Sequence, residues 1–218
     1  YRDLGARFCK WRAVITIGVD MPSRGCIDAN AHALARYAAL CQEAGLVPIV
    51  EPEVLINGAH TIETSYEVTL ETQRRVFGQL HRQGVMFEGM VLKPSMVISG
   101  TDCPQRATVE RVAEETLNCL RTTVPAAVPG IAFLSGGQSD ADATRHLDAM
   151  NRMGRDLRLP WQLTFSYARA LQNPVLETWR GDPSRAEQAS RELLHRAKLN
   201  AAASTGEYTE DMEQQKAA

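Results

Sequence analysis

Five short apolar segments alternate with five longer helical segments along this chain, and this alternation constrains the fold more than any other feature. The apolar segments are predicted to be strands and cover residues 10–17, 46–53, 90–97, 130–137 and 161–167. The segments with apolar residues at helical spacing cover residues 27–44, 61–83, 108–120, 140–153 and 184–202. Because a repeated strand–helix order needs right-handed crossovers, the sequence predicts an α/β fold with a parallel sheet.

Several residues mark where the predicted helices begin and end. Gly45 and Gly84 follow the first two helices at positions where a left-handed backbone ends a helix. Ser139 is a suitable N-cap for the fourth helix, and Gly154 is expected just beyond the end of that helix.

Two architectures fit this order of elements: an open, doubly wound sheet and a TIM (β/α)₈ barrel. No Gly-x-Gly-x-x-Gly pattern follows a predicted strand, which argues against dinucleotide binding. Polar residues gather where the strands end, as barrel active sites require. A barrel has eight strand–helix units in about 250 residues, and only five units are found here. We therefore predict a partial barrel over residues 1–203, further units upstream of Tyr1, and a polar, mobile tail over residues 204–218.

Composition narrows the range of functions. A net charge of -2 does not indicate a nucleic-acid or membrane partner, and no apolar stretch is long enough to cross a bilayer. The cysteines are odd in number and lack a Cys-x-x-Cys pair, so neither a disulfide framework nor a zinc site is expected. Reduced thiols in a cytoplasm fit this cysteine pattern best, and no signal peptide is visible. The histidines show no metal-ligand spacing and are expected to be solvated or helical bystanders: His32, His60, His81, His146 and His195.

Lys93 is the candidate nucleophile, because it lies within an apolar segment that is predicted to be a strand. An ammonium group in such surroundings is poorly hydrated, which favours the neutral amine that attacks carbonyl carbons and forms Schiff bases. The plainer alternative is a lysine with a buried stem whose charged head reaches water.

Each predicted strand carries polar side chains on one face, since side chains two residues apart on a strand point to the same side. Each set alone has a plainer explanation, such as a solvated basic end or the start of a loop. Their coincidence on all the strands favours one common site inside a barrel. The sets are Lys10 with Arg12, Glu51 with Glu53, Lys93 with Val91 and Ser95, Ser135 with Ile131 and Phe133, and Gln162 with Thr164 and Ser166.

These side chains predict Schiff-base chemistry on a ketone. Lys93 would attack the carbonyl, and the nearby charge of Lys10 would help to keep the attacking amine neutral by repulsion. Glu51 and Glu53 would move the protons that dehydration and carbon–carbon cleavage require.

The ends of the last two strands predict a phosphate site. The Gly136–Gly137 turn exposes backbone N–H groups just before a helix start, where the helix dipole favours an anion. The alternative is an ordinary tight turn between a strand and a helix. Arg12, on the far side of Lys93, is predicted to hold a second phosphate. The residues predicted to hold the first phosphate are Ser135, Gly136, Gly137, Ser166 and Arg169.

Longer segments around these residues follow the pattern of a known family. They are Phe8-Cys9-Lys10-Trp11-Arg12, residues 45–53, Val91-Leu92-Lys93-Pro94, Thr123-Val124-Pro125, residues 133–139 and residues 163–171, with weaker matches reaching Gly206-Glu207-Tyr208. On these segments, which span nearly the whole chain, the sequence resembles the class I, metal-independent fructose-1,6-bisphosphate aldolases.

The resemblance implies a (β/α)₈ lyase of glycolysis that reversibly cleaves fructose 1,6-bisphosphate to dihydroxyacetone phosphate and glyceraldehyde 3-phosphate. It implies that Lys93 forms the Schiff base, that Glu51 is the main general acid and base, and that Glu53 and Lys10 assist. No metal or other cofactor is expected, because the iminium is the electron sink, and a homotetramer is expected. The resemblance places Arg12 toward the 6-phosphate and Ser135, Gly136, Gly137, Ser166 and Arg169 at the 1-phosphate.

The chain departs from the family pattern in several places. The family's first three strands carry an aspartate and a lysine at the active centre and an arginine at a phosphate, and these strands have no counterpart here. Ala168 stands where the family usually has glycine, so a positive φ would be costly. Ser95 replaces the usual asparagine. The family's C-terminal tyrosine is also missing, since the chain ends on residues 214–218.

Two alternatives to an aldolase remain at this stage. One is a non-catalytic remnant, either an interaction module or a partial gene product, although an open sheet would leave edge strands unpaired. The other is a different Schiff-base lyase, such as a transaldolase-like enzyme, which the two phosphate sites and the long match disfavour.

Overall fold

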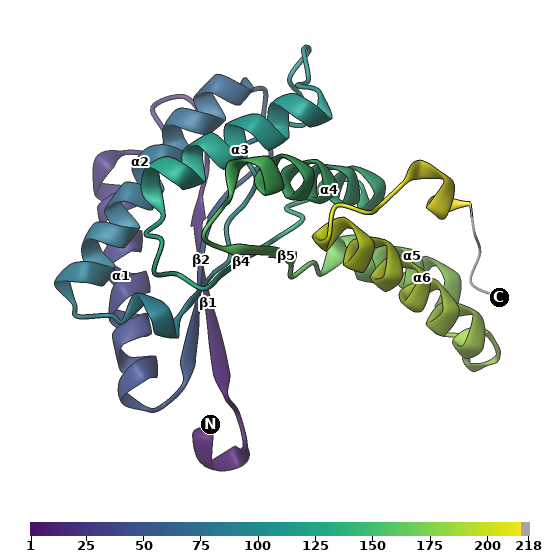
Figure 1. Ribbon diagram of the computed structural model, residues 1–218, viewed down its shortest axis with the longest axis horizontal. Helices are drawn as coiled ribbons and strands as arrows, with labels where there is room; N and C mark the ends of the chain where they lie inside the picture. The colour runs from purple at the N-terminus through teal and green to yellow at the C-terminus, as the bar shows by residue number, and fades with distance from the viewer. Residues whose placement is uncertain (215–218) are drawn as a thin grey trace.

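The computed structural model describes residues 1–214 as one parallel sheet with helices between its strands (Figure 1). The strands follow the order of the chain across the sheet: β1 (Phe8–Ile15), β2 (Val47–Val54), β3 (Val91–Leu92), β4 (Gly130–Phe133) and β5 (Gln162–Phe165). The α-helices are α1 (Arg24–Glu43), α2 (Ile62–Arg82), α3 (Val109–Thr123), α4 (Asp140–Leu157), α5 (Arg169–Trp179) and α6 (Ala186–Ser204). Short 3₁₀ turns occupy η1 (Arg2–Leu4), η2 (Phe87–Gly89), η3 (Pro183–Arg185) and η4 (Glu210–Glu213).

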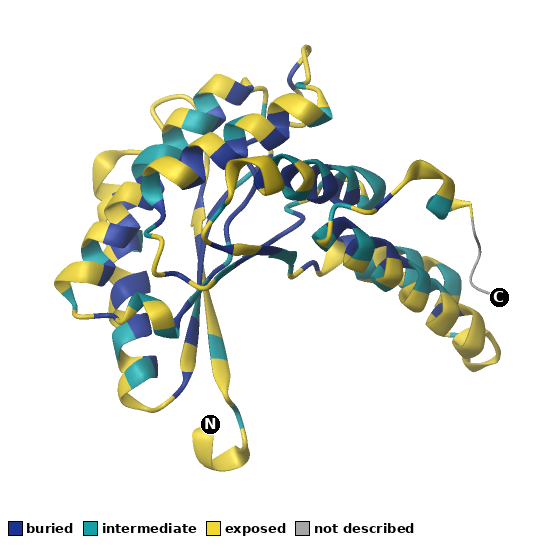
Figure 2. Cartoon of the chain, in the orientation of Figure 1, coloured by how far each residue is buried: buried dark blue, intermediate teal, exposed yellow. Residues whose placement is uncertain are grey.

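Helices α1 to α4 form an arc around one side of the strands, and α5 and α6 lie together at its end (Figure 1). The helix faces turned toward the sheet are buried and the outer faces are exposed (Figure 2). Consecutive parallel strands, each followed by a helix on the same side, are the pattern of a TIM barrel. The fold is therefore an arc of five such units, as the sequence predicts, and β1 and β5 are edge strands among the described residues.

Local sequence explains where the first four helices begin. The N-cap side chain of each accepts a hydrogen bond from a backbone N–H in the first turn, which stabilises a helix by about 1 kcal/mol. The caps are Ser23, Thr61, Thr108 and Ser139. The glycines predicted to end the first two helices have the expected left-handed φ, +69° at Gly45 and +69° at Gly84.

Several elements differ from their predicted extent, and β4, for example, ends at Phe133. The predicted third strand, 90–97, keeps only two residues in the sheet, because Pro94 has no N–H and side chains satisfy the backbone beyond it. The N–H of Val97, for example, donates to Thr116 Oγ1 at 3.0 Å. Helix α4 does not stop at Gly154 but continues to Leu157.

Helix α5 was not predicted at all. Pro174 lies inside it, and a proline within a segment normally indicates that a helix ends there. The segment nevertheless forms helix because Ala170 packs into the core and the N–H groups of Leu171 and Gln172 both donate to Ala168 O.

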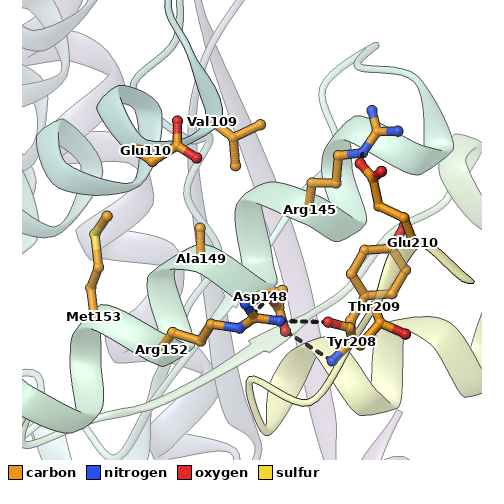
Figure 3. A pocket seen from close by; sticks show the side chains of 10 residues that line it. All are labelled: Val109, Glu110, Arg145, Asp148, Ala149, Arg152, Met153, Tyr208, Thr209 and Glu210. Atoms are coloured by element: carbon orange, nitrogen blue, oxygen red, sulfur yellow. Dashed lines mark hydrogen bonds and ion pairs between the residues drawn. The ribbon is translucent and has the colours of Figure 1, made fainter.

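The residues after α6 also differ from the expected mobile tail. Tyr208 is buried, its N–H donates to Asp148 at 2.9 Å, and its carbonyl accepts from Arg152 at 2.6 Å (Figure 3). Further on, Glu213 pairs with the buried guanidinium of Arg196 at 2.6 Å. Residues 204–214 are therefore docked on α4 and α6, and residues 215–218 lie outside the described part of the chain.

Two loops that follow β2 and β3 are joined by backbone hydrogen bonds at a point where only glycine fits. Gly100 N–H donates to His60 O at 2.8 Å, and a Cβ on Gly100 would lie 2.1 Å from the carbonyl oxygen of Gly58. Neither backbone can move without breaking this pairing, so a side chain at position 100 is excluded.

We expect Gly100→Ala to lower the free energy of unfolding by about 3 kcal/mol or more, because the clash is with backbone. Urea unfolding followed by circular dichroism measures the change. The matched control is Gly78→Ala at an exposed position of helix α2, where no atom lies within 4 Å of the added Cβ. That change should stabilise the protein slightly. Equal stability of Gly100→Ala and the wild type would contradict the packing seen here.

Candidate active site

One cavity of about 230 Å³ lies where the strands end, and it collects nine of the ten predicted site residues. The tenth, Gly137, is adjacent: a Cβ on it would lie 3.5 Å from both terminal nitrogens of Arg169. Leu134 and Ala168 also line the cavity, and the nine predicted residues in its lining are Lys10, Arg12, Glu51, Glu53, Lys93, Ser135, Gly136, Ser166 and Arg169.

The register of the first three strands places the charged side chains on one face. Arg12 pairs with Glu51 across β1 and β2, and Ile49 pairs with Val91 across β2 and β3. Since partners in parallel strands point to the same side, Lys93, two residues after Val91, points to the side of Glu51. The backbone N–H of Lys93 continues the ladder by donating to Val50 O at 2.8 Å.

Glu51 bridges two lysines. Its Oε1 lies 3.3 Å from Lys93 Nζ and its Oε2 lies 3.1 Å from Lys10 Nζ. The carboxylate is 3% exposed, and only 12% of the Lys93 side chain reaches solvent, against 42% for Lys10. The stem of Lys93 is therefore buried, and its nitrogen lies at the wall of the cavity against a buried carboxylate.

The contact with Glu51 matters for the attack of the Lys93 amine on a carbonyl carbon. A carboxylate at this distance stabilises an ammonium charge, whereas attack on a carbonyl carbon needs the neutral amine. Glu51 lies between the nitrogens of Lys93 and Lys10, with one carboxylate oxygen against each. The same carboxylate is the nearest group that can accept a proton from Lys93.

Arg12 and Glu53 form a second ion pair in the cavity, through the Nε of the arginine. The hydrogen bond to the carboxylate raises the pKa of Arg12 above its ordinary value, so the guanidinium stays charged. Because Nε is engaged with Glu53, the two terminal nitrogens are the donors that can face an anion.

The predicted phosphate turn follows β4 and leads into α4. Gly136 and Gly137 have φ values of +60° and +96°, which glycine adopts without strain, and the turn is closed by Gln138 N–H donating to Ser135 O at 3.0 Å. Ser139 caps α4 by accepting from Asp142 N–H at 3.0 Å. This geometry points backbone donors and the positive end of a helix dipole at one place.

The prediction that Ser135 shares an inward face with Ile131 and Phe133 was wrong. Ile131 pairs with Leu92, on the opposite side from Lys93, and both Ile131 and Phe133 are buried in the core. Ser135 reaches the cavity because the chain has already left β4, which ends at Phe133, and turns through the two glycines.

Ala168 stands where the family usually has glycine, but its backbone does not have a positive φ. Its φ is -100° and its ψ is -75°, so an alanine is accommodated without left-handed strain. Ser95, which replaces the asparagine usual in the family, accepts a hydrogen bond from Val54 N–H at 3.1 Å. This bond connects the segment after β3 to the end of β2.

Sequence reasoning missed two residues behind the phosphate turn. His146 was expected to be a bystander, but its ring is 5% exposed and its Nδ1 lies 2.6 Å from the side-chain oxygen of Gln138. No local pattern reveals the pair, since it depends on how the first turns of α4 pack beneath Gln138. The one available signal is a histidine in a predicted helix on the face that buries Ala143 and Leu147.

Burial lowers the pKa of His146 from 6.5 to about 4, with Asp142 and Glu110 acting against this shift and Arg106 and Arg145 adding to it. The folded protein therefore holds the neutral ring, and the unfolded chain binds the proton more readily between these two pH values. The contribution of His146 to stability is complete above pH 6.5 and is lost as the pH falls toward 4.

We expect this loss to be about 3 kcal/mol across that pH window. Urea unfolding at pH 7 and at pH 4.5 measures it, with the wild type compared with His146→Asn, which cannot titrate. The wild type should lose more stability than the variant on acidification. Parallel pH profiles for the two proteins would contradict the assignment.

A larger hollow of about 480 Å³ lies between α3, α4 and residues 208–210, away from the strand ends (Figure 3). Four of its five charged side chains form two pairs, Arg145 with Glu210 at 3.1 Å and Arg152 with Asp148 at 2.8 Å, and the fifth is Glu110. Tyr208, Thr209 and Glu210 of the C-terminal segment form part of its wall. Among the helices of residues 1–214, none has the length and apolar character needed to traverse a bilayer.

Comparison with known proteins shows the family of this chain. The sequence model of the family "Fructose-bisphosphate aldolase class-I" matches residues 1–218. A probable class 1 fructose-bisphosphate aldolase of Xanthomonas campestris is 56% identical over 209 residues, covering 95% of this chain and 62% of the relative. A chloroplastic fructose-bisphosphate aldolase of Arabidopsis thaliana is 50% identical, covering 100% of this chain and 53% of the relative.

A solved structure agrees with the sequence comparisons. The fructose-bisphosphate aldolase of Plasmodium falciparum, in a complex with TRAP and a small-molecule inhibitor, superposes with a TM-score of 0.92 at 45% identity. The match covers 95% of this chain and 60% of that one. The chain thus spans about 60% of the length of the solved relative, which confirms the predicted partial TIM barrel.

Proposed function

This chain belongs to the class I fructose-bisphosphate aldolase family, and we propose that it supplies the Schiff-base lysine and a phosphate-binding turn for the reversible cleavage of fructose 1,6-bisphosphate. The observation that carries the proposal is the cavity in which Lys93 Nζ lies 3.3 Å from the buried carboxylate of Glu51, and which the Ser135–Gly136 turn also lines. A nucleophile, a proton carrier and an anion site within one cavity are what a ketose phosphate lyase needs.

In the proposed reaction, Lys93 passes a proton to Glu51 and its nitrogen adds to the C2 carbonyl of the ketose. Loss of water gives a protonated imine. Removal of the proton from the C4 hydroxyl then breaks the C3–C4 bond, whose electron pair moves into the iminium to give an enamine, and glyceraldehyde 3-phosphate leaves. Protonation of the enamine at C3 and hydrolysis release dihydroxyacetone phosphate and restore Lys93.

Burial supports Glu51 as the proton carrier. Glu51 contacts Lys93 through one carboxylate oxygen and Lys10 through the other. A proton that Glu51 receives from Lys93 would therefore stay on a buried group next to the new imine. Glu53 is held by Arg12 and lies farther along β2, which suits a supporting role. Lys10 lies 3.1 Å from the other oxygen of the Glu51 carboxylate, which suits an assisting role.

The two ends of the substrate would be held by different groups. We assign the 1-phosphate to the turn of Ser135, Gly136 and Gly137, with Ser166 and Arg169, because backbone donors, a helix start and a guanidinium meet there. The terminal nitrogens of Arg12 are assigned to the 6-phosphate at the other side of the cavity.

A test of the whole activity uses two proteins. One is the 218-residue chain, and the other, which we call the joined protein, has the upstream segment of the Xanthomonas campestris relative fused ahead of it. We expect the joined protein to release triose phosphates from fructose 1,6-bisphosphate, and we expect a chelator to leave that rate unchanged. A joined protein that folds but releases no triose phosphate would overturn the proposed function and favour a non-catalytic interaction module.

Arg169→Ala in the joined protein is expected to weaken substrate binding more than turnover. Removal of a charge-assisted pair of hydrogen bonds to a phosphate should raise KM about tenfold or more, with a smaller fall in kcat. Steady-state kinetics measure both, and Arg180→Ala, an exposed arginine just after α5, is the control. A fall confined to kcat would contradict the assignment of Arg169 to the phosphate.

The expected assembly and location are further proposals. A homotetramer follows from the resemblance alone, whereas a cytoplasmic location follows from the cysteine pattern, which fits reduced thiols. The exposed apolar side chains Phe8, Trp11 and Val14 on edge strand β1 favour burial against further protein. The compartment can vary in this family, as the chloroplastic relative illustrates.

A further inference from the structure

His146 and Gln138 form a hydrogen-bonded pair directly behind the phosphate turn. His146 Nδ1 lies 2.6 Å from Gln138 Oε1, and because a carboxamide oxygen only accepts, Nδ1 is the donor. The ring is buried in the second turn of α4, whereas Gln138 lies between the turn glycines and the helix cap. The pair therefore connects the interior of α4 to the loop that precedes it.

The other end of the Gln138 side chain reaches toward the segment that carries the nucleophile. Its Nε2 lies 3.5 Å from the sulfur of Met96, a buried residue three positions after Lys93. The main chain makes a second connection, since Leu134 N–H donates to Pro94 O at 3.1 Å. Gln138 is thus held between α4 on one side and the segment after Lys93 on the other.

The backbone of Gln138 belongs to the turn itself. Its N–H closes the turn on Ser135 O at 3.0 Å, and the two residues before it have positive φ values. A turn with two glycines has many accessible conformations, so a fixed side chain at its end reduces the entropy that binding must otherwise remove. Burial also keeps the ring of His146 neutral near pH 7, so the hydrogen bond adds no charge behind the anion site.

We propose that His146 is a positioning residue that, by holding Gln138, fixes the Ser135–Gly137 turn relative to Lys93 and so sets the affinity for the phosphate of a ketose phosphate. This inference rests on the proposed function and deepens it, since it concerns the same site. His146 does not touch the substrate. It acts on the phosphate end of the ligand through Gln138 and leaves the attack on the carbonyl to Lys93.

The test compares two ketones in borohydride trapping on the 218-residue chain. Dihydroxyacetone phosphate carries the phosphate and dihydroxyacetone lacks it, but both offer the same carbonyl group to Lys93. We expect His146→Leu to raise the half-saturating concentration of dihydroxyacetone phosphate about fivefold, the effect of one hydrogen bond. Labelling by dihydroxyacetone should be unchanged, and His146→Asn, whose amide can donate from the position of Nδ1, should stay within about twofold of the wild type.

A second variant guards against a folding defect in α4. Gln138→Leu removes the acceptor without disturbing the helix core and should produce the same shift, and the double variant should be no worse than either single variant. An unchanged half-saturating concentration of the phosphate in both single variants would overturn the inference. So would an equal loss of labelling with both ketones, which indicates general disruption.

The wild type separates this inference from the proposed function. If the wild type is labelled at Lys93 and the variants behave like the wild type, His146 has no positioning role, but the proposed function still holds. A wild type that neither ketone labels at Lys93 would overturn the proposed function and this inference with it.

Discussion

Lys93→Met is expected to abolish the cleavage of fructose 1,6-bisphosphate by the joined protein, with a fall in turnover of at least about 10³-fold. Methionine keeps the length and burial of the side chain but has no nucleophilic nitrogen. The covalent imine cannot form without that nitrogen, and the C3–C4 bond then has no electron sink. Release of triose phosphates at saturating substrate measures the effect.

The lysines of the chain provide the controls, because only four are present: Lys10, Lys93, Lys198 and Lys216. Lys198 is exposed on α6 and outside the cavity, so Lys198→Met should keep full turnover. Urea unfolding should show that both methionine variants are folded. Wild-type turnover in Lys93→Met would remove the lysine from the mechanism.

Glu51→Gln is expected to have the second-largest effect, a fall in kcat of about 10² to 10⁴-fold in the joined protein. The amide has the size of the carboxylate but cannot accept a proton from Lys93. It also leaves the two nearby ammonium groups, at 3.3 Å and 3.1 Å from the Glu51 oxygens, without their countercharge. Single-turnover kinetics measure the rate at which the imine forms.

Glu67→Gln, the same substitution at an exposed position of α2, is the matched control and should leave kcat unchanged. Glu53→Gln should have a smaller effect than Glu51→Gln, because Glu53 pairs with Arg12 and not with Lys93. If Glu53→Gln lowered kcat as much as Glu51→Gln, the assignment of the main proton carrier would need to be exchanged between the two carboxylates.

The arrangement of the first three strands could be predicted because it follows from local pattern. Side chains alternate along a strand, and β1 and β2 are long enough for the alternation to hold through Lys10, Arg12, Glu51 and Glu53. Lys93 follows the same rule even though β3 is only two residues long, since its N–H still bonds to Val50.

Alternation along the strand does not predict the position of Ser135 after the fourth strand. The predicted run 130–137 assumed alternation through Ser135, but the strand ends at Phe133 and a glycine turn then changes the direction of the chain. Turn conformation decides which way Ser135 points, and strand periodicity carries no information about it. The site residue was identified for the wrong geometric reason.

Tertiary contacts account for the remaining differences. Helix α5 forms in spite of Pro174, and residues 208–213 dock through a buried tyrosine and through Glu213 on Arg196. The Gln138–His146 pair likewise joins a turn to a helix interior. Each depends on the packing of segments that are remote or differently oriented, which single-residue propensities do not encode.

The most direct test of a reactive lysine in this cavity is borohydride trapping of the 218-residue chain with dihydroxyacetone phosphate, followed by peptide mapping. Four lysines and the terminal amine compete for the label. The account predicts a single reduced adduct on Lys93, which a large excess of inorganic phosphate suppresses. An adduct on Lys10 or Lys198 with Lys93 left unmodified would contradict it.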